Sequence, residues 1–201
     1  MGLIGPDRKE AWEQLAKEFQ GDMIEGGSWK GDRIEVHHGL WTLYLETDTV
    51  PTGDANITYT RMRAPFTSKD GMVFKIFKSS IFSNVGRLLG MQDIHIGYDS
   101  FDDDFIIKGN NEQQITQLFE NPIIRDLITL QPQLSLEITS TEGTDDTDGQ
   151  NELYFSFNGV ITDIETLKDL FDLFMEVLDE MVRIGSAYNK APEIDLYTDE
   201  A

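Results

Sequence analysis

The residues best suited to chemistry form a cationic cluster in a chain that is otherwise strongly acidic. The 201 residues include 37 Asp and Glu against 16 Lys and Arg, a formal charge of −21. Residues 55–92 are the exception, with six cations against one acid, Asp70, which leaves 10 cations against 36 acids elsewhere. The six cations are Arg61, Arg63, Lys69, Lys75, Lys78 and Arg87. Such a cluster either neutralises acidic neighbours or holds an anionic ligand.

Four side chains of this segment make the candidate ligand site. The alternation of a predicted strand puts Tyr59, Arg61 and Arg63 on one face, with the two guanidinium groups about 7 Å apart. Lys75 lies on the following strand, which we expect to pair with it. Together these side chains could bind a carboxylate or a phosphate. The alternative is a solvated face, or one neutralised by acids of the helices or of Asp102–Asp104, and the sequence leaves both readings open.

The histidines predict no metal site. His37 and His38 are adjacent in a predicted strand, so they point to opposite faces. His95 is the exposed position of an alternating segment. A first-row metal needs three or four convergent ligands. We therefore expect no metal and no cofactor.

The loop at residues 142–152 has a spacing that resembles a calcium site. Counting back from Gly149, an EF-hand loop needs an acid or Asn where this chain has Thr144 and a Glu where it has Phe155. The pattern fails at both ends. A solvated hairpin loop is the prediction.

Motifs of catalysis are absent from the sequence. The chain has no Cys, so thiol chemistry is excluded. Residues 26–31 are glycine-rich but lack the spacing of a phosphate-binding loop. Asp102–Asp104 are adjacent, whereas a pair of catalytic carboxyl groups must face each other across a cleft. We expect Asp104 to begin a strand.

The apolar pattern predicts an α+β fold, with an antiparallel sheet packed against helices and a long C-terminal helix. The sheet should consist of a four-strand meander plus a C-terminal hairpin. Predicted strands are 33–38, 41–46, 56–64 and 72–78 for the meander, 104–108, and 133–140 with 152–158 for the hairpin. Predicted helices are 7–20, 81–89, 111–120, 122–130 and 163–184.

The helix boundaries carry their own signals. Asn111 begins one helix, and Asn121 caps the next one with Pro122 at its first position. Thr162 and Glu165 have the spacing of a capping box at the start of the last helix. That helix has the strongest apolar stripe in the chain, formed by Ile164, Leu167, Phe171, Phe174, Leu178 and Met181.

The sequence predicts one domain over residues 1–189, with halves 1–97 and 98–189 that could meet near residues 97–103. Residues 190–201 are polar and acidic, which predicts a loose tail. The strong negative charge disfavours nucleic acid and anionic membranes as partners. Charges interrupt residues 1–20 where a signal peptide would be apolar, so we expect a cytoplasmic protein. Oligomeric state is left open.

Several segments resemble a family of uncharacterised bacterial cytosolic proteins, a domain of unknown function. They are TYTRMRAPF at 58–66, FKIFKSSIFSNVGRLLGMQDIHIG at 74–97, FDDDFIIKGNNEQQITQLF at 101–119, NELYF at 151–155 and IGSAY at 184–188. The resemblance spans residues 1–190. It implies a conventional cytosolic protein and no assigned activity.

These observations favour a non-enzymatic binding or interaction module. Its ligand would be a small anion or a protein partner, held by the face of Arg61 and Arg63 or by a groove under the last helix. Two alternatives stay open. One is an enzyme that acts on a small anionic substrate, and the other is a carrier that encloses a hydrophobic ligand between the sheet and the last helix.

Overall fold

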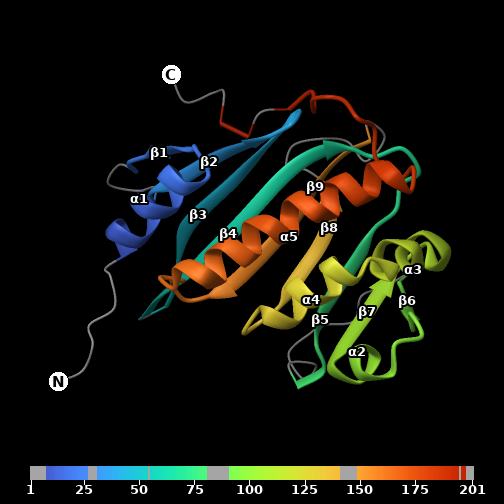
Figure 1. Cartoon of the computed structure of the whole chain (residues 1–201). Helices are drawn as coiled ribbons and strands as arrows, with labels where there is room; N and C mark the ends of the chain where they lie inside the picture. The colour runs from blue at the N-terminus through green and yellow to red at the C-terminus, as the bar shows by residue number, and fades with distance from the viewer. Residues whose placement is uncertain are drawn as a thin grey trace.

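An antiparallel sheet and the helices on one of its faces make up the fold (Figure 1). The computed structural model describes residues 8–26, 31–53, 55–80, 91–140, 149–194 and 196–197. Within them the strands are β1 (Asp22–Ile24), β2 (Arg33–His38), β3 (Trp41–Thr52), β4 (Ala55–Thr67), β5 (Phe74–Lys78), β6 (Gln92–Ile94), β7 (Phe105–Gly109), β8 (Ser135–Ser140) and β9 (Gln150–Asn158). The predicted α+β class and antiparallel sheet are confirmed.

Strands β1 to β4 form a meander at one end of the sheet. A two-residue turn joins β2 to β3, because His38 pairs with Trp41 across it. Gly39 opens this turn with φ +58, a conformation that favours glycine at the first turn position. The next hairpin pairs Tyr44 with Arg63 at one end and Thr52 with Ala55 at the other. The meander therefore sets the register of Arg61 and Arg63.

The fourth strand of the predicted meander lies elsewhere. Strand β5 does not pair with β4, because the sheet order is β1-β2-β3-β4-β9-β8-β5-β7-β6. The edge of β4 is occupied by β9, which pairs with it from Tyr59–Asn158 to Thr67–Gln150. This register places Met62 opposite Phe155, both fully buried. Hydrophobic pairing over long sequence distance has thus displaced the chain neighbour, and β1 completes the meander.

The predicted halves of the chain share this one sheet. The hairpin β8–β9 lies between β4 and β5, so strands from the second half are inserted among strands from the first. Strand β7 pairs with β5 on one side and with β6 on the other.

The longer helices lie on one face of the sheet (Figure 1). They are α1 (Arg8–Glu18), α3 (Glu112–Glu120), α4 (Pro122–Leu130) and α5 (Ile164–Arg183), and α5 crosses the sheet between α1 and the pair α3–α4. The core lies between this layer and the sheet. Its aromatic contacts include Phe19 stacked on Phe171 at 4.9 Å and Phe74 edge-on to Phe119 at 5.4 Å. None of the described helices is long and apolar enough to cross a membrane.

The predicted caps are confirmed at two helices and wrong at one. Asn111 accepts from the amide of Gln114, and Asn121 accepts from the amide of Ile123. Helix α5 does not use the predicted capping box of Thr162. Its N-cap is Asp163, which accepts hydrogen bonds from the amide and the hydroxyl of Thr166 at 2.8 and 2.7 Å. Because the Asp163 carboxylate accepts from both donors of Thr166, the N-cap lies at Asp163, one residue later than the predicted cap at Thr162.

Replacement of Asp163 by Ala should lower the free energy of unfolding by about 1 kcal/mol at neutral pH. The hydrogen bonds from Thr166 lower the pKa of Asp163. Its ionised form is therefore favoured by folding, and this stabilisation is present above the unfolded pKa of about 4 and is lost as pH falls through the folded pKa. Urea denaturation at pH 7 and near pH 3 checks this. Asp163→Asn keeps a good cap without titrating, and an Ala variant as stable as wild type at pH 7 would contradict the assignment.

Three sequence predictions fall outside the described residues. They are the helix at 81–89, most of the loop at 142–152 with its calcium-like spacing, and the centre of the glycine-rich segment at 26–31.

Candidate functional site

The candidate site lies on the sheet face that points away from the helices, here called the charged face. Side-chain alternation defines it: Met62 and Ala64 of β4 are fully buried on the helix side, so Arg61 and Arg63 point the other way. Its central members are Arg33, Tyr44, Glu46, Asp48, Tyr59, Arg61, Arg63, Lys75, Glu137, Glu152 and Tyr154.

Arg63 is the fixed cation of this face. Its guanidinium donates two hydrogen bonds to Glu152, at 2.9 and 3.2 Å, and Glu46 lies 4.0 Å away. The side chains of Arg63 and Glu152 are 13% and 3% exposed. Burial opposes the charge of Arg63, but Glu152 and Glu46 more than offset it, so its pKa is raised. A bidentate pair at this depth holds both side chains in place.

Arg61 is held more loosely. It forms an ion pair with Asp48 at 2.8 Å, and the two side chains are 30% and 41% exposed. Its Nε is buried and finds no hydrogen-bond partner among the described residues. The predicted juxtaposition of Arg61 and Arg63 on one strand face is therefore present, with unequal partners.

Lys75 is not where the sequence analysis expects it. Because β9 and β8 separate β5 from β4, Lys75 lies three strands from Arg63, about 14 Å across the sheet. Its ammonium bonds both oxygens of Glu137 at 3.1 Å. Tyr59 sits at the other side of Arg61, opposite Asp48 and Asn158. The four predicted residues share a face but do not converge on one point.

Tyr154 is the side chain that the sequence analysis missed. It lies opposite Arg63 on one side and Glu137 on the other. Tyr154 therefore lies between the arginines of β4 and Lys75 of β5. Burial raises the pKa of its phenol, against the pull of Arg61 and Arg63. The alternation in residues 151–155 could have revealed it, because Glu152 and Tyr154 share a strand face.

The counter-charges come from neighbouring strands and not from the predicted sources. Asp48, Glu137 and Glu152 belong to β3, β8 and β9. The helix acid Glu176 instead accepts a hydrogen bond from Asn121. Asp102 accepts from the amides of Ile96 and Gly97. Asp104 ends helix α2 (Asp99–Asp104), and β7 begins at Phe105, so its predicted strand position is wrong by one residue.

The predicted loose tail reaches the charged face. The guanidinium carbon of Arg33 lies 3.6 Å from the ring centroid of Tyr197, and the Tyr197 hydroxyl donates to Glu46. The rings of Tyr44 and Tyr197 are 5.1 Å apart. Burial raises the pKa of Tyr197, with the carboxylate of Glu46 adding to the effect. This part of the tail is therefore bound to the sheet.

The histidines keep to separate partners. His37 bonds the hydroxyl of Thr42, whereas His38 bonds Asp179 of α5 at 2.9 Å on the helix side. His95 is exposed between two buried isoleucines. Among the described residues no three His, Asp or Glu side chains are grouped to hold a metal ion.

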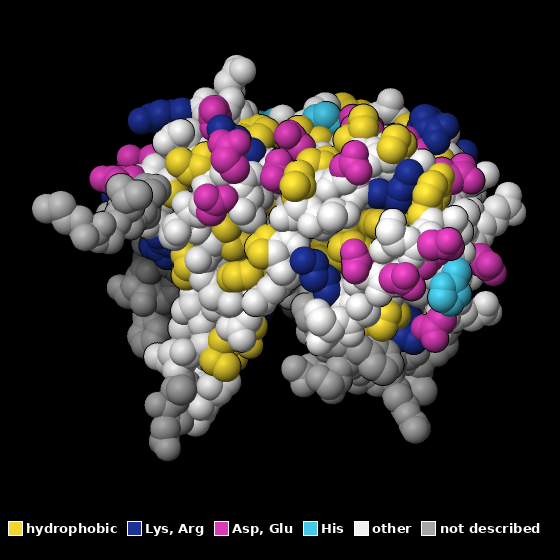
Figure 2. Space-filling model, turned by 60° about the horizontal axis from the view of Figure 1, so that its bottom comes forward, with side chains coloured by type: hydrophobic (Ala, Val, Ile, Leu, Met, Phe, Trp, Pro, Cys, Tyr) yellow, Lys and Arg dark blue, Asp and Glu magenta, His cyan; other side chains and the backbone are white. Residues whose placement is uncertain are grey.

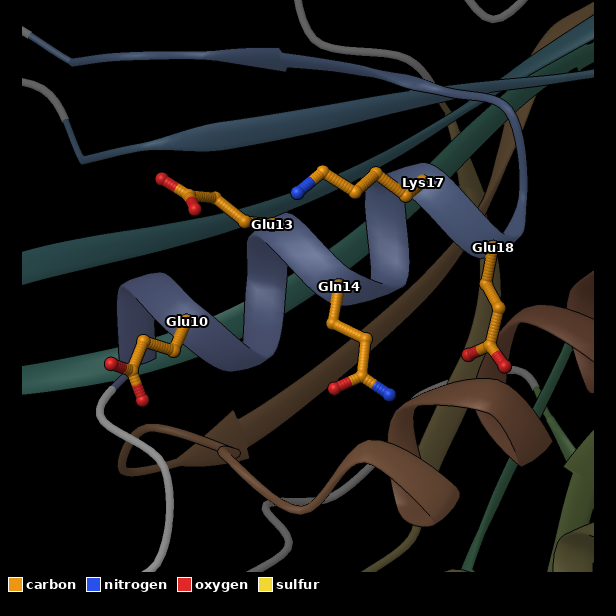
Figure 3. A pocket seen from close by; sticks show the side chains of 5 residues that line it. All are labelled: Glu10, Glu13, Gln14, Lys17 and Glu18. Atoms are coloured by element: carbon orange, nitrogen blue, oxygen red, sulfur yellow. The ribbon is translucent and has the colours of Figure 1, made fainter.

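A shallow hollow of about 560 Å³ lies along α1 (Figure 3). Its lining residues are all on that helix: Glu10, Glu13, Gln14, Lys17 and Glu18. Gln14 and Glu18 point toward α5, and Glu13 and Lys17 lie on the other side of α1. A second hollow is lined by polar side chains of α3. Both are charged or polar, unlike the apolar pockets that enclose hydrophobic ligands.

Figure 2 shows the molecule from the side that is at the bottom of Figure 1. On this face Asp and Glu side chains are spread among hydrophobic ones, with Lys and Arg side chains between them. On this face the Lys and Arg side chains are therefore dispersed among acidic ones.

Comparisons with known proteins give no further assignment. No protein-family model, no curated protein and no solved structure matches this chain. The resemblance to a bacterial family therefore stays a prediction.

Proposed function

We propose that this protein is a non-catalytic binding module whose charged face binds carboxylate or phosphate groups of a ligand or partner protein. The observation that carries the proposal is the unequal pair of guanidinium groups on β4. Arg63 is locked by Glu152, and Arg61 is held by an exposed acid. The two point the same way from one strand.

The pair of Arg61 with Asp48 is the exchangeable one. An exposed ion pair contributes only about 0–1 kcal/mol, so an incoming anion displaces Asp48 at little cost. The same anion cannot displace Glu152 from Arg63, because that would leave a carboxylate unpaired at 3% exposure. Arg61 is thus the binding cation and Arg63 the structural one. The hydroxyl of Tyr154, between Arg63 and Glu137, can donate to the same ligand.

The balance of charges favours a ligand with more than one anionic group. Each cation of the face already has a carboxylate within about 3 Å, which weakens the field that a single free anion would meet. A ligand that contacts both Arg61 and a second donor, such as the Tyr154 hydroxyl, gains binding free energy from both contacts. The Arg63–Glu152 pair stays in place. Di- and tricarboxylates, pyrophosphate and acidic peptides belong to this class.

A thermal-shift screen at constant ionic strength tests the proposal. Citrate and pyrophosphate at ten times their Kd should stabilise the wild type by about 1.4 kcal/mol, an increase of about 3–6 °C for a chain of this size. Arg61→Ala should lose this increase. Lys168→Ala, which removes a half-buried cation of α5 paired with Glu18 and Glu165, is the matched control and should keep it. Equal increases in all three proteins would overturn the proposal.

A further inference from the structure

We propose that Arg33, Tyr44, Glu46 and Arg63 form a recognition site for a tyrosine in an acidic peptide segment. The chain fills this site with its own Tyr197, and a tyrosine-bearing acidic segment of a partner protein takes the same place. The proposal rests on the binding role of the charged face and names the partner chemistry. Its independent evidence is the set of contacts that Tyr197 makes with Arg33, Tyr44 and Glu46.

The site surrounds the tyrosine on three sides. The Arg33 guanidinium stacks on the ring at 3.6 Å from its centroid, and the Tyr44 ring lies 5.1 Å away at 56°. Glu46 accepts from the hydroxyl. A cation over an aromatic face, a neighbouring ring and an acceptor for the phenol together define one side-chain type. A phenylalanine would leave the Glu46 acceptor unused.

The residues of the site are held by the sheet. Arg33 lies opposite Glu46, and Tyr44 lies opposite Arg63, in the register of β2, β3 and β4. The guanidinium of Arg33 is also fixed by Glu35 at 2.8 Å, and the Arg33 side chain is 13% exposed. Sites built on strands are held more precisely than sites on loops, and three of these residues are also held by pairs within the sheet. The site therefore persists without Tyr197.

The acidic character of the segment follows from the surrounding cations. Residues 193–201 read EIDLYTDEA, with four acids around the tyrosine. Arg33, Arg61 and Arg63 lie on the strands beneath or beside the seat. The carboxylates paired with these cations weaken the attraction, so the acids of the segment tune its affinity while the contacts of the tyrosine ring and hydroxyl define the site. The same complementarity selects a partner segment with acids next to a tyrosine.

The tail is attached in a way that permits exchange. After α5, the Tyr188 amide bonds the Thr67 carbonyl at 3.0 Å and the Glu193 amide bonds Gln150 at 3.3 Å. These contacts bring Tyr197 near its seat without adding it as a strand. A tethered occupant competes at an effective concentration of about 1 mM. A partner must outcompete it, so the tail sets the threshold for binding.

The experiment uses the full chain with Tyr197→Ala and a fluorescent peptide of residues 190–201. Fluorescence anisotropy should show that the peptide binds Tyr197→Ala at least about 10-fold more tightly than wild type, because the tethered competitor is gone. A peptide with its tyrosine replaced by Ala should lose at least about 10-fold, and one with Phe should lose less. Tyr188→Ala, which removes an exposed tyrosine of the same segment, is the matched control and should behave as wild type.

Two results would overturn the proposal of a tyrosine site. Peptide binding that is no tighter for Tyr197→Ala than for wild type would overturn the proposal, as would binding that survives Arg33→Ala in the same background. If Tyr197→Ala unfolds, Tyr197→Phe replaces it and should give a smaller gain of the same sign. Arg61→Ala separates the two proposals. In Arg61→Ala, loss of the anion effect with peptide binding retained supports both proposals. An anion effect that persists in Arg61→Ala overturns the anion proposal alone, because Arg33→Ala decides the tyrosine site.

Discussion

Replacement of Phe174 by Ala should lower the free energy of unfolding by about 3–5 kcal/mol. Phe174 is fully buried in α5, the helix that crosses the sheet between the other helices (Figure 1). The loss combines the transfer free energy of the ring with the cavity that rigid neighbours cannot close. The same helix buries Leu170, Phe171 and Leu173. The cavity would therefore open in the middle of the core.

A thermal melt measures this effect directly. For a domain of this size the loss corresponds to a decrease in Tm of about 6–20 °C. Leu130→Ala is the control, since Leu130 is a helix residue of which 59% is exposed, and its effect should stay within about 0.5 kcal/mol. A decrease of less than about 2 °C for Phe174→Ala would mean that α5 does not pack as described.

Arg63→Ala should cost about 3–5 kcal/mol, because it leaves the carboxylate of Glu152 buried without its partner. Arg61→Ala should cost less than about 1 kcal/mol, since the side chains of Arg61 and Asp48 are 30% and 41% exposed, against 13% and 3% for Arg63 and Glu152. Urea denaturation of both variants gives the comparison. Two cations on one strand face should thus differ severalfold in their effect on stability.

A double replacement distinguishes pairing from simple loss of packing. Arg63→Met with Glu152→Leu removes both charges, and it should be more stable than Arg63→Met alone because no unpaired charge remains. Equal losses in Arg61→Ala and Arg63→Ala would contradict the division into a binding cation and a structural cation.

Local signals predicted most of the elements. Apolar spacing gave α1 and α5 within two residues, and the Asn-Pro pair at residues 121–122 gave both the end of α3 and the cap of α4. Strands β2, β3, β4, β8 and β9 were predicted, but β3 continues to Thr52, beyond its predicted end at residue 46. These features depend on neighbours within a few residues, which the sequence displays.

These local signals did not predict which strands pair when they are far apart in the sequence. The position of β5 depends on whether β4 is better covered by β5 or by β9, and both are apolar enough to qualify. In the structure β9 takes this edge, with Met62 opposite Phe155. The N-cap at Asp163 was missed because two adjacent residues, Thr162 and Asp163, can both cap. Only the hydrogen bonds of Thr166 distinguish them.

In the candidate site, too, the arrangement within one strand could be predicted, whereas contacts over long sequence distance could not. One strand's alternation put Arg61 and Arg63 on the same face, as found. Lys75 depended on strand order and was misplaced. The seat of Tyr197 brings β2 and β3 together with a residue about 150 positions later, and a polar tail gives no periodic signal from which that contact could be predicted.

The most direct test of the central claim is a titration of the ¹⁵N-labelled protein with citrate, followed by amide chemical shifts. Binding on the charged face should move amides of β3, β4 and β9 around Arg61, and Arg61→Ala should abolish the changes. The chemical shifts of the amides in α1 and α5 should not change. Changes centred on those helices, or changes that persist in Arg61→Ala, would contradict the claim that this face binds anionic groups.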